Sequence, residues 1–374
     1  MAELKRYITI RRLLEFVLMI ILYRSFEIAG IKKYAVAIVF CLVFLFLARK
    51  RKWSPEVLCV AIPSVTYLVT GSMMGMLHGT YQSDTVKIFL YGILSFMLAL
   101  SMYAYYGKDM KRIADVQFFS CCAVYLSLTI VYMVTRLARV ESTFAFVFGI
   151  FTIYYAYQKR WKLFALSTVF MYLADKRIVL LGVVVSLFVM GVLWLFEHNQ
   201  KLIYAAWGLV TGLIYLYLYL IYSGTMEAFC WGANINTNGR VEMYGRMAKE
   251  FSVGFLGEGL GVVENMLACW NIKVFANLHN DLLKFHIELG FLGLLLYLLS
   301  YALMFWLAEK KFGKSKTCFL LGISVYSMIL YATDNVSIYV MYLLPMYSVF
   351  FAVLSSDGKT PVSYTHLTLP TIRL

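Results

Sequence analysis

The sequence is poor in charged residues and in proline. Of its 374 residues only 14% are charged, against about 25% in an ordinary soluble domain. A soluble protein of this size exposes too much surface for so few charges, so the composition excludes a water-soluble globular protein. With 5 prolines and 24 glycines, it also excludes a collagen-like or a disordered chain.

Acidic residues are scarcer than basic ones, which gives a net charge of +14. The basic residues stand in short bursts between apolar runs, as at residues 49–52, 159–162 and 310–316. Such bursts are typical of loops on the cytoplasmic side of a membrane rather than of a nucleic-acid-binding face. No nucleic-acid partner is therefore expected.

Several sequence motifs are missing. The chain contains no CxxC, HExxH, GxxxxGK[ST] or GxSxG motif and no repeat of 20–50 residues. These patterns would mark a metal site, a phosphate-binding loop, a serine nucleophile or a solenoid. We therefore expect neither a metal ion nor a cofactor.

Long apolar runs dominate what is present, since 62% of the residues are hydrophobic. A membrane-crossing helix needs about 20 mostly apolar residues. The sequence therefore predicts an all-α polytopic integral membrane protein with about 12 transmembrane helices. The expected spans are 13–29, 34–48, 56–76, 88–106, 113–135, 143–157, 161–174, 178–196, 202–222, 282–308, 317–333 and 336–354.

Alternation of these spans puts the basic bursts on one side, with both ends of the chain in the cytoplasm. The first apolar segment lacks a small-residue cleavage site and is expected to be retained. Residues 1–359 are interpreted as one transmembrane domain that includes an extracytoplasmic loop at 223–281. Residues 360–374, which include His366, lack helical periodicity and resemble translated adaptor sequence, so they are interpreted as a non-native tail.

The 223–281 loop is the one long connection, and long loops of this kind are often functional. Its tryptophans and phenylalanines predict an ordered outer subdomain, with a helix over 240–251 capped by Asn238. Cys230 and Cys269 both lie in this loop. The pair could form a disulfide in an oxidising compartment, although spacing alone leaves this open.

Three arginines are candidate ligands for phosphate, because the guanidinium group is a planar fork of donors. Arg240 and Arg246 lie in the predicted outer helix, and Arg177 opens a span. Each has a structural alternative. Arg246 could pair with Glu242 at i,i+4, and Arg177 could be an interfacial anchor beside Asp175.

A second group of candidates surrounds the point where the loop re-enters the membrane. The glycine-rich run 255–261 could present backbone amides to a ligand or form a tight turn. His279 and Asn280 follow, and a histidine there could donate to phosphate or exchange a proton near neutral pH. His286, seven residues on, is expected on the same helical face as His279. Glu288 is either a base or a structural partner of Lys284.

The order of these motifs resembles the bacterial O-antigen ligase/O-antigen polymerase family. The matching residues are Lys176-Arg177, Gly239-Arg240, the run Leu256-Gly257-Glu258-Gly259-Leu260-Gly261, His279-Asn280, and Glu288-Leu289-Gly290-Phe291-Leu292-Gly293. The polymerases often show an Arg-x10-Gly pattern in their outer loops. Arg246 and Gly257 fit it, whereas Phe188 stands at the matching position after Arg177. The spacing therefore favours a polymerase over a ligase.

The resemblance implies a metal-independent glycosyltransferase that acts on glycans carried by undecaprenyl diphosphate. On this reading Arg177, Arg240, Arg246 and Asn280 hold the diphosphate, while His279 and Glu288 are the catalytic candidates. The expected location is the bacterial cytoplasmic membrane, with the active site on the extracytoplasmic face. The implied partners are the lipid-linked oligosaccharide, a glycan acceptor, the lipid bilayer, a chain-length regulator and a flippase. A ligase, a lipid-linked oligosaccharide transporter and a membrane scaffold remain as alternatives.

Overall fold

The computed structural model describes residues 2–26, 32–48, 54–80, 83–135, 142–196, 199–251, 254–270 and 277–356. This part of the chain is helical and contains no strand. The tail at 360–374 lies outside it. The longer helices are α1 (Ala2–Phe26), α2 (Lys32–Leu47), α3 (Pro55–His78), α4 (Ser83–Tyr106), α5 (Met110–Thr135), α6 (Phe144–Tyr157), α7 (Trp161–Leu173), α8 (Arg177–Leu195), α9 (Gln200–Tyr222), α13 (Asp281–Phe312), α14 (Lys314–Tyr331) and α15 (Val340–Leu354). The short ones are η1 (Gly107–Asp109), α10 (Thr225–Gly232), α11 (Arg240–Glu250), α12 (Val262–Cys269) and η2 (Val336–Ile338).

Each expected span overlaps one of the longer helices. Within the described residues, 5 segments are long and apolar enough to cross a membrane: Pro55–His78, Thr85–Val134, Arg177–Leu195, Gln200–Tyr222 and Asp281–Phe312. Shorter apolar helices accompany them, such as α6 and α15. The all-helical, membrane-type architecture is thus confirmed, while twelve crossings remain a prediction.

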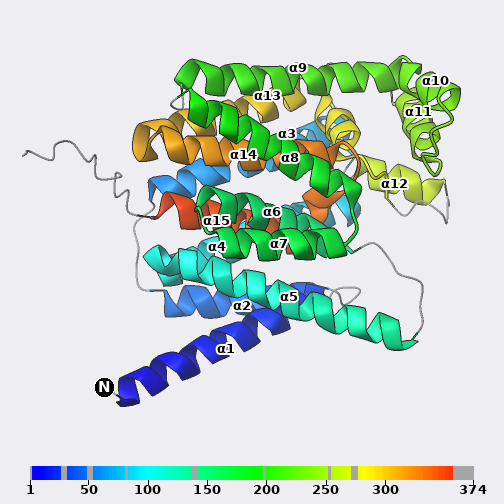
Figure 1. Cartoon of the computed structure of the whole chain (residues 1–374). Helices are drawn as coiled ribbons and strands as arrows, with labels where there is room; N and C mark the ends of the chain where they lie inside the picture. Colours follow the sequence, from blue (N-terminus) through cyan, green and yellow to red (C-terminus); the bar gives the residue numbers. More distant parts are fainter. Residues whose placement is uncertain are drawn as a thin grey trace, which may run out of the picture.

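The longer helices run side by side as one bundle (Figure 1). Within it α13 packs against α3, and α14 packs against α8. Nearly every residue of α6 is buried, as expected for a helix that is apolar on all faces. Other helices expose large apolar side chains such as Phe46, Phe188 and Leu195, which suits a surface that faces lipid.

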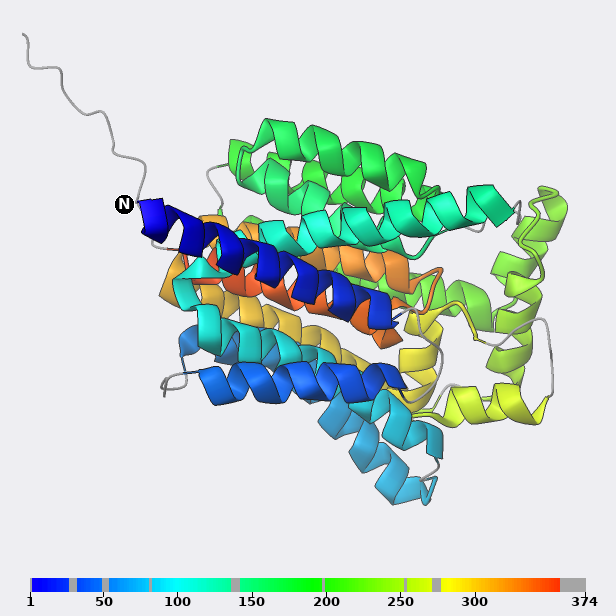
Figure 2. The same cartoon turned by 90° about the horizontal axis from the view of Figure 1, so that it is seen from below.

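The segment between α9 and α13 gathers at one end of the bundle. Figures 1 and 2 both show α10, α11 and α12 at this end, with the start of α1 at the other. The helix predicted over 240–251 is confirmed as α11. Its predicted cap is wrong, because the residue before α11 is Gly239 in the left-handed region (φ 75°) and no side chain caps the helix. Asn238 is itself left-handed (φ 52°) and belongs to the preceding turn.

The disulfide considered for this segment does not form. Cys230 and Cys269 are both free thiols, as are the other five cysteines of the chain. The segment is therefore held by packing: α11 contacts α9 and α10, and α12 contacts α13 and α4.

Helix α13 is broken at Gly290, whose backbone (φ 71°, ψ −179°) is not helical. The glycine-rich run of the preceding segment lies against this break. The Glu258 and Gly259 amides donate to the Ile287 and Glu288 carbonyls at 2.9 and 3.0 Å. Beyond the break, the Phe291 amide donates to the Gly254 carbonyl at 3.0 Å. The irregular backbone thereby satisfies the groups that the break leaves unpaired.

Close contact of two glycines makes this pairing possible. A Cβ atom on Gly257 would lie 2.3 Å from the Gly290 nitrogen, and one on Gly290 would lie 2.4 Å from the Gly257 nitrogen. Only hydrogen fits in that space. Gly257 of the glycine-rich run and Gly290 of α13 are therefore the two sides of one backbone contact.

Candidate functional site

Asp334 is the centre of a charged cluster at the end of the bundle that carries α10–α12. It lies in the connection between α14 and α15 and is 5% exposed. Lys176, in the turn before α8, donates from Nζ to Oδ2 at 3.0 Å. His279, just before α13, places Nδ1 at 3.5 Å from Oδ1. The Asn335 amide also donates to Oδ1, at 2.9 Å.

These neighbours keep Asp334 ionised. Burial alone would raise the pKa of its carboxyl group, but the nearby His279 ring nitrogen and the charge of Lys176 outweigh burial. Together with the Asn335 amide they lower the pKa from 3.8 to about 2. A lowered pKa stabilises the folded state above the ordinary carboxyl range, and this contribution is lost only as the pH falls through about 2.

Arg240 reaches the same cluster from α11. Its Nη1 donates to the Thr333 carbonyl at 3.2 Å, next to Asp334. No further hydrogen bond of its guanidinium group to a described residue is present, so most of the donor fork remains available. Tyr244 lies nearby, and burial raises the pKa of its hydroxyl while Arg240 lowers it. It therefore stays a neutral hydrogen-bonding group beside the guanidinium.

His279 lies in a turn just before α13, and the conformation of its backbone sets the position of its side chain. Its φ of 54° lies in the left-handed region, and Tyr244 donates to its carbonyl at 2.7 Å. The helix starts two residues later because Asn280 is its N-cap and accepts from the Leu283 amide at 3.0 Å. The side chain of His279 keeps 29% of its surface exposed. One ring nitrogen thus faces Asp334 while part of the imidazole remains accessible.

The predicted common face of His279 and His286 is wrong. Since His279 precedes the helix, the seven-residue spacing does not carry its side chain to the face of His286. That residue is buried in α13, where its Nδ1 lies 3.1 Å from the Tyr222 hydroxyl.

Asn280 is buried and uses both ends of its amide within the protein. Besides capping α13, its Nδ2 donates to the Tyr217 hydroxyl at 2.9 Å. Tyr217 in turn donates to the Ala332 carbonyl at 2.7 Å. Asn280 therefore ties the start of α13 to α9 and to the connection that holds Asp334.

Arg177 and Arg246 lie outside the Asp334 cluster. Arg177 is the first residue of α8 and its side chain is exposed, whereas Lys176 before it points to Asp334. Arg246 is exposed on α11 and stacks on Trp270, with its guanidinium carbon 4.0 Å from the ring centroid. Among the described residues Arg246 makes no ion pair with Glu242, whose carboxylate accepts from Thr237 instead.

Glu288 is fully buried beside the break in α13. Its Oε1 accepts from the Gly261 amide at 2.7 Å, and its Oε2 accepts from the Tyr67 hydroxyl at 3.0 Å. Lys284 lies 4.0 Å away, which is the predicted i,i+4 pair, and it also contacts Glu264. One carboxylate oxygen therefore holds the glycine-rich run against α13, and the other bonds to α3.

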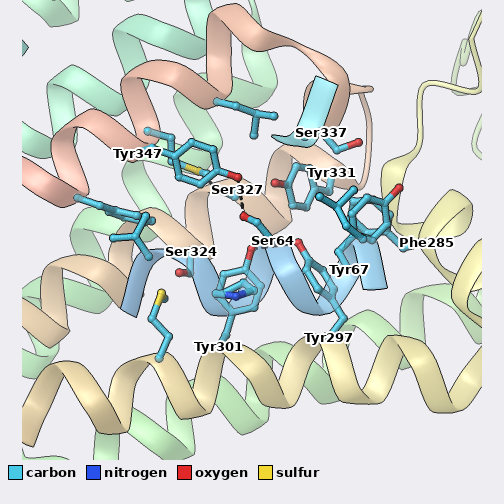
Figure 3. A pocket seen from close by; sticks show the side chains of 18 of the residues that line it. Ser64, Tyr67, Phe285, Tyr297, Tyr301, Ser324, Ser327, Tyr331, Ser337 and Tyr347 are labelled. Atoms are coloured by element: carbon cyan, nitrogen blue, oxygen red, sulfur yellow. Dashed lines mark hydrogen bonds between the residues drawn. The ribbon is translucent and has the colours of Figure 1, made fainter. Parts of the chain in front are cut away.

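A small cavity of about 40 Å³ lies inside the bundle next to this region. Figure 3 shows hydroxyl groups around it. Ser337 lies at one end, and its backbone amide donates to Asp281 Oδ2 at 2.8 Å. Hydroxyl groups inside an apolar bundle need polar partners, and several of these bond to other protein groups, as Ser64 does to Tyr347 and Tyr297 to Tyr301. The hydroxyl-bearing residues are Ser64, Tyr67, Tyr297, Tyr301, Ser324, Ser327, Tyr331, Ser337 and Tyr347.

Two members of the cluster, Lys176 and Asp334, were not among the predicted site residues. A signal for Asp334 was present, because it is the one charged residue between Lys316 and Asp357. An ionisable residue in so apolar a stretch is costly unless it is paired or functional. Lys176 carried no such signal beside Arg177. Within the described residues, no group of three His, Cys, Asp or Glu side chains is placed to hold a metal ion.

The comparisons with known proteins bear on the same region. No curated protein matches the chain. Residues 162–298, which run from α7 into α13, match the sequence profile of the family described as O-antigen ligase. Lys176, Arg240 and His279 lie inside this match, and Asp334 lies beyond it. Members of that family are glycosyltransferase-like enzymes of O-antigen biosynthesis. Residues 162–298 are therefore similar to the O-antigen ligase family, and the resemblance to the O-antigen ligase/O-antigen polymerase family is confirmed over this part of the chain.

Proposed function

We propose that this protein polymerises undecaprenyl-diphosphate-linked oligosaccharide repeat units into a surface polysaccharide, on the outer face of the bacterial cytoplasmic membrane. The observation that carries the proposal is the meeting of Lys176, Arg240 and His279 around Asp334. Together with Asp334, these side chains come from three separate connections of an apolar bundle: α7–α8, α9–α13 and α14–α15. A diphosphate at the membrane surface requires such a concentration of donors.

The diphosphate binds at Arg240 and Lys176 in this proposal. The open donors of Arg240 suit two phosphate oxygens, and Lys176 supplies a second positive charge. The start of α13 adds to the attraction, because the N-terminus of a helix carries a partial positive charge. Asp334 holds Lys176 and His279 in place before the donor arrives. Arg177 and Arg246, both exposed, attract the anionic donor from a distance.

The transfer is a displacement at the anomeric carbon. The acceptor hydroxyl oxygen forms a bond to that carbon, and the bond from the carbon to the diphosphate oxygen breaks. Arg240 and Lys176 stabilise the charge that develops on the leaving diphosphate. His279 accepts the hydroxyl proton, and Asp334 orients its ring through Nδ1. A single displacement inverts the anomeric configuration and needs no metal ion.

Asn280 and Glu288 support the site in this proposal rather than react. Asn280 is buried and holds the backbone of His279 in place. Glu288 has both carboxylate oxygens occupied, so it fixes the break in α13. The choice of polymerase over ligase rests on the Arg246-x10-Gly257 spacing, since the two activities differ only in the acceptor.

A lipid-linked oligosaccharide transporter is the second candidate, because transporters also use broken helices. Here α13 is broken at Gly290, nine residues after its start. The freed carbonyls of Ile287 and Glu288 are occupied by the glycine-rich run and do not line an ion site. This arrangement favours a transferase.

Arg240→Lys tests the diphosphate role. The variant keeps the charge but loses the fork, so we expect transfer to fall on the order of 10²-fold. The measurement is the rate of polymer formation by purified protein from a lipid-linked repeat unit. Lys249→Ala, which removes an exposed basic residue of the same helix, is the matched control and should retain wild-type activity. Wild-type transfer by the Lys variant would contradict the proposal.

Cysteine labelling tests the orientation. Gly232 ends α10, and a side chain added there meets nothing within 4 Å. In a variant whose native cysteines are replaced, Gly232→Cys should react with an impermeant maleimide on intact cells. Ser315→Cys, exposed near the start of α14, should react only after lysis. The reverse pattern would place the Asp334 cluster on the cytoplasmic side and refute the proposed location.

A further inference from the structure

A surface groove lies at the tip of the α10–α12 end, apart from the Asp334 cluster. It has a volume of about 270 Å³ and is formed by the end of α10, the turn that follows and the first turn of α11. Its lining combines apolar and neutral polar side chains with one carboxylate: Trp231, Ile235, Asn234, Asn236, Thr237 and Glu242. None of its lining residues is basic.

The apolar part of the groove is exposed. Trp231 is 67% exposed and Ile235 is 49% exposed. An exposed tryptophan costs free energy in water unless a partner covers it. A flat aromatic ring suits a ligand with one apolar face, and the C–H face of a pyranose ring is such a surface.

The polar part of the groove suits hydroxyl and amide groups. Asn236 accepts from the Asn238 amide at 2.9 Å, which fixes the turn and leaves its side-chain NH₂ group for a ligand. Glu242 accepts from Thr237 at 3.3 Å. Asn234 is exposed and makes no hydrogen bond to a described residue through its side chain. Without a basic residue the groove offers no counter-charge to phosphate, in contrast to the Asp334 cluster.

The groove and the cluster share one short stretch of backbone. Gly239 and Val241 line the groove, while Arg240 between them reaches the Thr333 carbonyl in the cluster. A ligand whose diphosphate is held by Arg240 therefore has its sugars close to the groove.

We infer that the groove is a glycan subsite that binds uncharged sugar rings, with Trp231 as the stacking platform and the asparagines as hydrogen-bonding partners. The identity of the glycan rests on the proposed function: it is either the sugar of the lipid-linked donor or the end of the acceptor chain. The subsite holds these sugars beside the reacting diphosphate and lengthens the contact between polymer and enzyme.

Binding to lipid-free glycan tests the subsite directly. The probe is oligosaccharide released by mild acid from the surface polysaccharide of cells that carry this protein. Titration calorimetry should show binding to the purified wild-type protein. Trp231→Ala should weaken it roughly 30-fold, as for a buried aromatic anchor. Asn234→Gly should weaken it as well, and glycine tolerates the left-handed backbone of this residue (φ 51°).

Phe229→Ala is the matched control. Phe229 lies on the same helix and is 66% exposed, but it does not line the groove. A glycan subsite predicts wild-type binding for this variant. Equal losses in both variants would indicate that the aromatics of α10 anchor the protein at the membrane interface, and would overturn the inference. Binding that is absent in the wild type, or unchanged in Trp231→Ala, would overturn it too.

Kinetic measurements distinguish a groove that binds the donor sugar from one that binds the acceptor. They also test the glycan subsite separately from the polymerase function. If the groove holds the donor, Trp231→Ala raises the KM for the lipid-linked repeat unit. If it holds the acceptor, the variant instead raises the KM for lipid-free acceptor and shortens the polymer. Arg240→Lys should bind lipid-free glycan like the wild type although it transfers slowly. Trp231-dependent binding by a protein that transfers nothing would uphold the groove and refute the polymerase.

Discussion

Replacing His279 by alanine is expected to lower polymer formation by about 10²–10⁴-fold, the usual contribution of a general base. The side chain is placed for this role, with Nδ1 at 3.5 Å from Asp334 and part of the ring exposed. The measurement is the transfer rate of purified protein, with folding checked by size-exclusion chromatography. Near-wild-type turnover in His279→Ala would remove the imidazole from the reaction.

The pH dependence of transfer distinguishes two roles of His279. A histidine that accepts the proton must be neutral, so activity should fall as the pH drops from 8 to 5. A histidine that binds diphosphate is stronger when charged, so activity should rise over the same range. Asp334 does not produce either trend, because its pKa is lowered to about 2. The wild-type profile should lose its slope in His279→Gln.

Two variants control the assignment of this profile. Asp281 lies close in the chain and is buried, so Asp281→Asn removes its titration and should leave the slope in place. Asp334→Asn removes the charge that pairs with Lys176 and His279. It should slow transfer, because both side chains lose the partner that holds them in place. If the slope disappeared in Asp281→Asn but persisted in His279→Gln, the pH dependence would belong to Asp281 and not to His279.

Gly290→Ala is expected to destabilise the fold on the order of 4 kcal/mol, because it adds a strained backbone and an overpacked contact. Gly290 has a φ of 71°, and the new Cβ would lie 2.4 Å from the Gly257 nitrogen. Gly257→Ala should have a similar effect through the clash alone, since its Cβ would lie 2.3 Å from the Glu288 carbonyl oxygen. The yield of monodisperse protein in detergent and its melting temperature measure the loss.

Gly208→Ala is the control for this pair. Gly208 lies in α9, where an added Cβ meets nothing within 4 Å. Alanine favours a helix over glycine by about 1 kcal/mol, so this variant should be as stable as the wild type or more so. Gly290→Ala with wild-type yield and melting temperature would show that the break in α13 does not depend on the contact with Gly257.

The class of the protein and the positions of its helices follow from composition and segment length. A chain with 62% hydrophobic and 14% charged residues is suited to a membrane. In lipid the backbone must satisfy its own hydrogen bonds, which favours helices. The longer helices overlap the apolar runs for this reason. The order of the short motifs was enough to indicate the family, since the profile match covers residues 162–298.

Which basic residues meet could be decided only by the tertiary structure. Adjacent Lys176 and Arg177 looked alike in the sequence, and the left-handed backbone of Asp175 (φ 56°) sets the turn from which Lys176 reaches Asp334. Helical periodicity relates residues only within one continuous helix. His279 lies in a turn before α13 begins. Helical periodicity therefore does not relate the direction of its side chain to that of His286.

Contacts between residues far apart in the chain could not be predicted from the sequence either. Asp334 lies 158 positions from Lys176 in the chain, and the glycine-rich run was open to several interpretations until its contact with Gly290 was known. Composition and periodicity report how a residue relates to solvent, to lipid and to its own helix. Contacts between separate helices depend on how the whole bundle packs, and that packing brought Lys176, Arg240, His279 and Asp334 to one place.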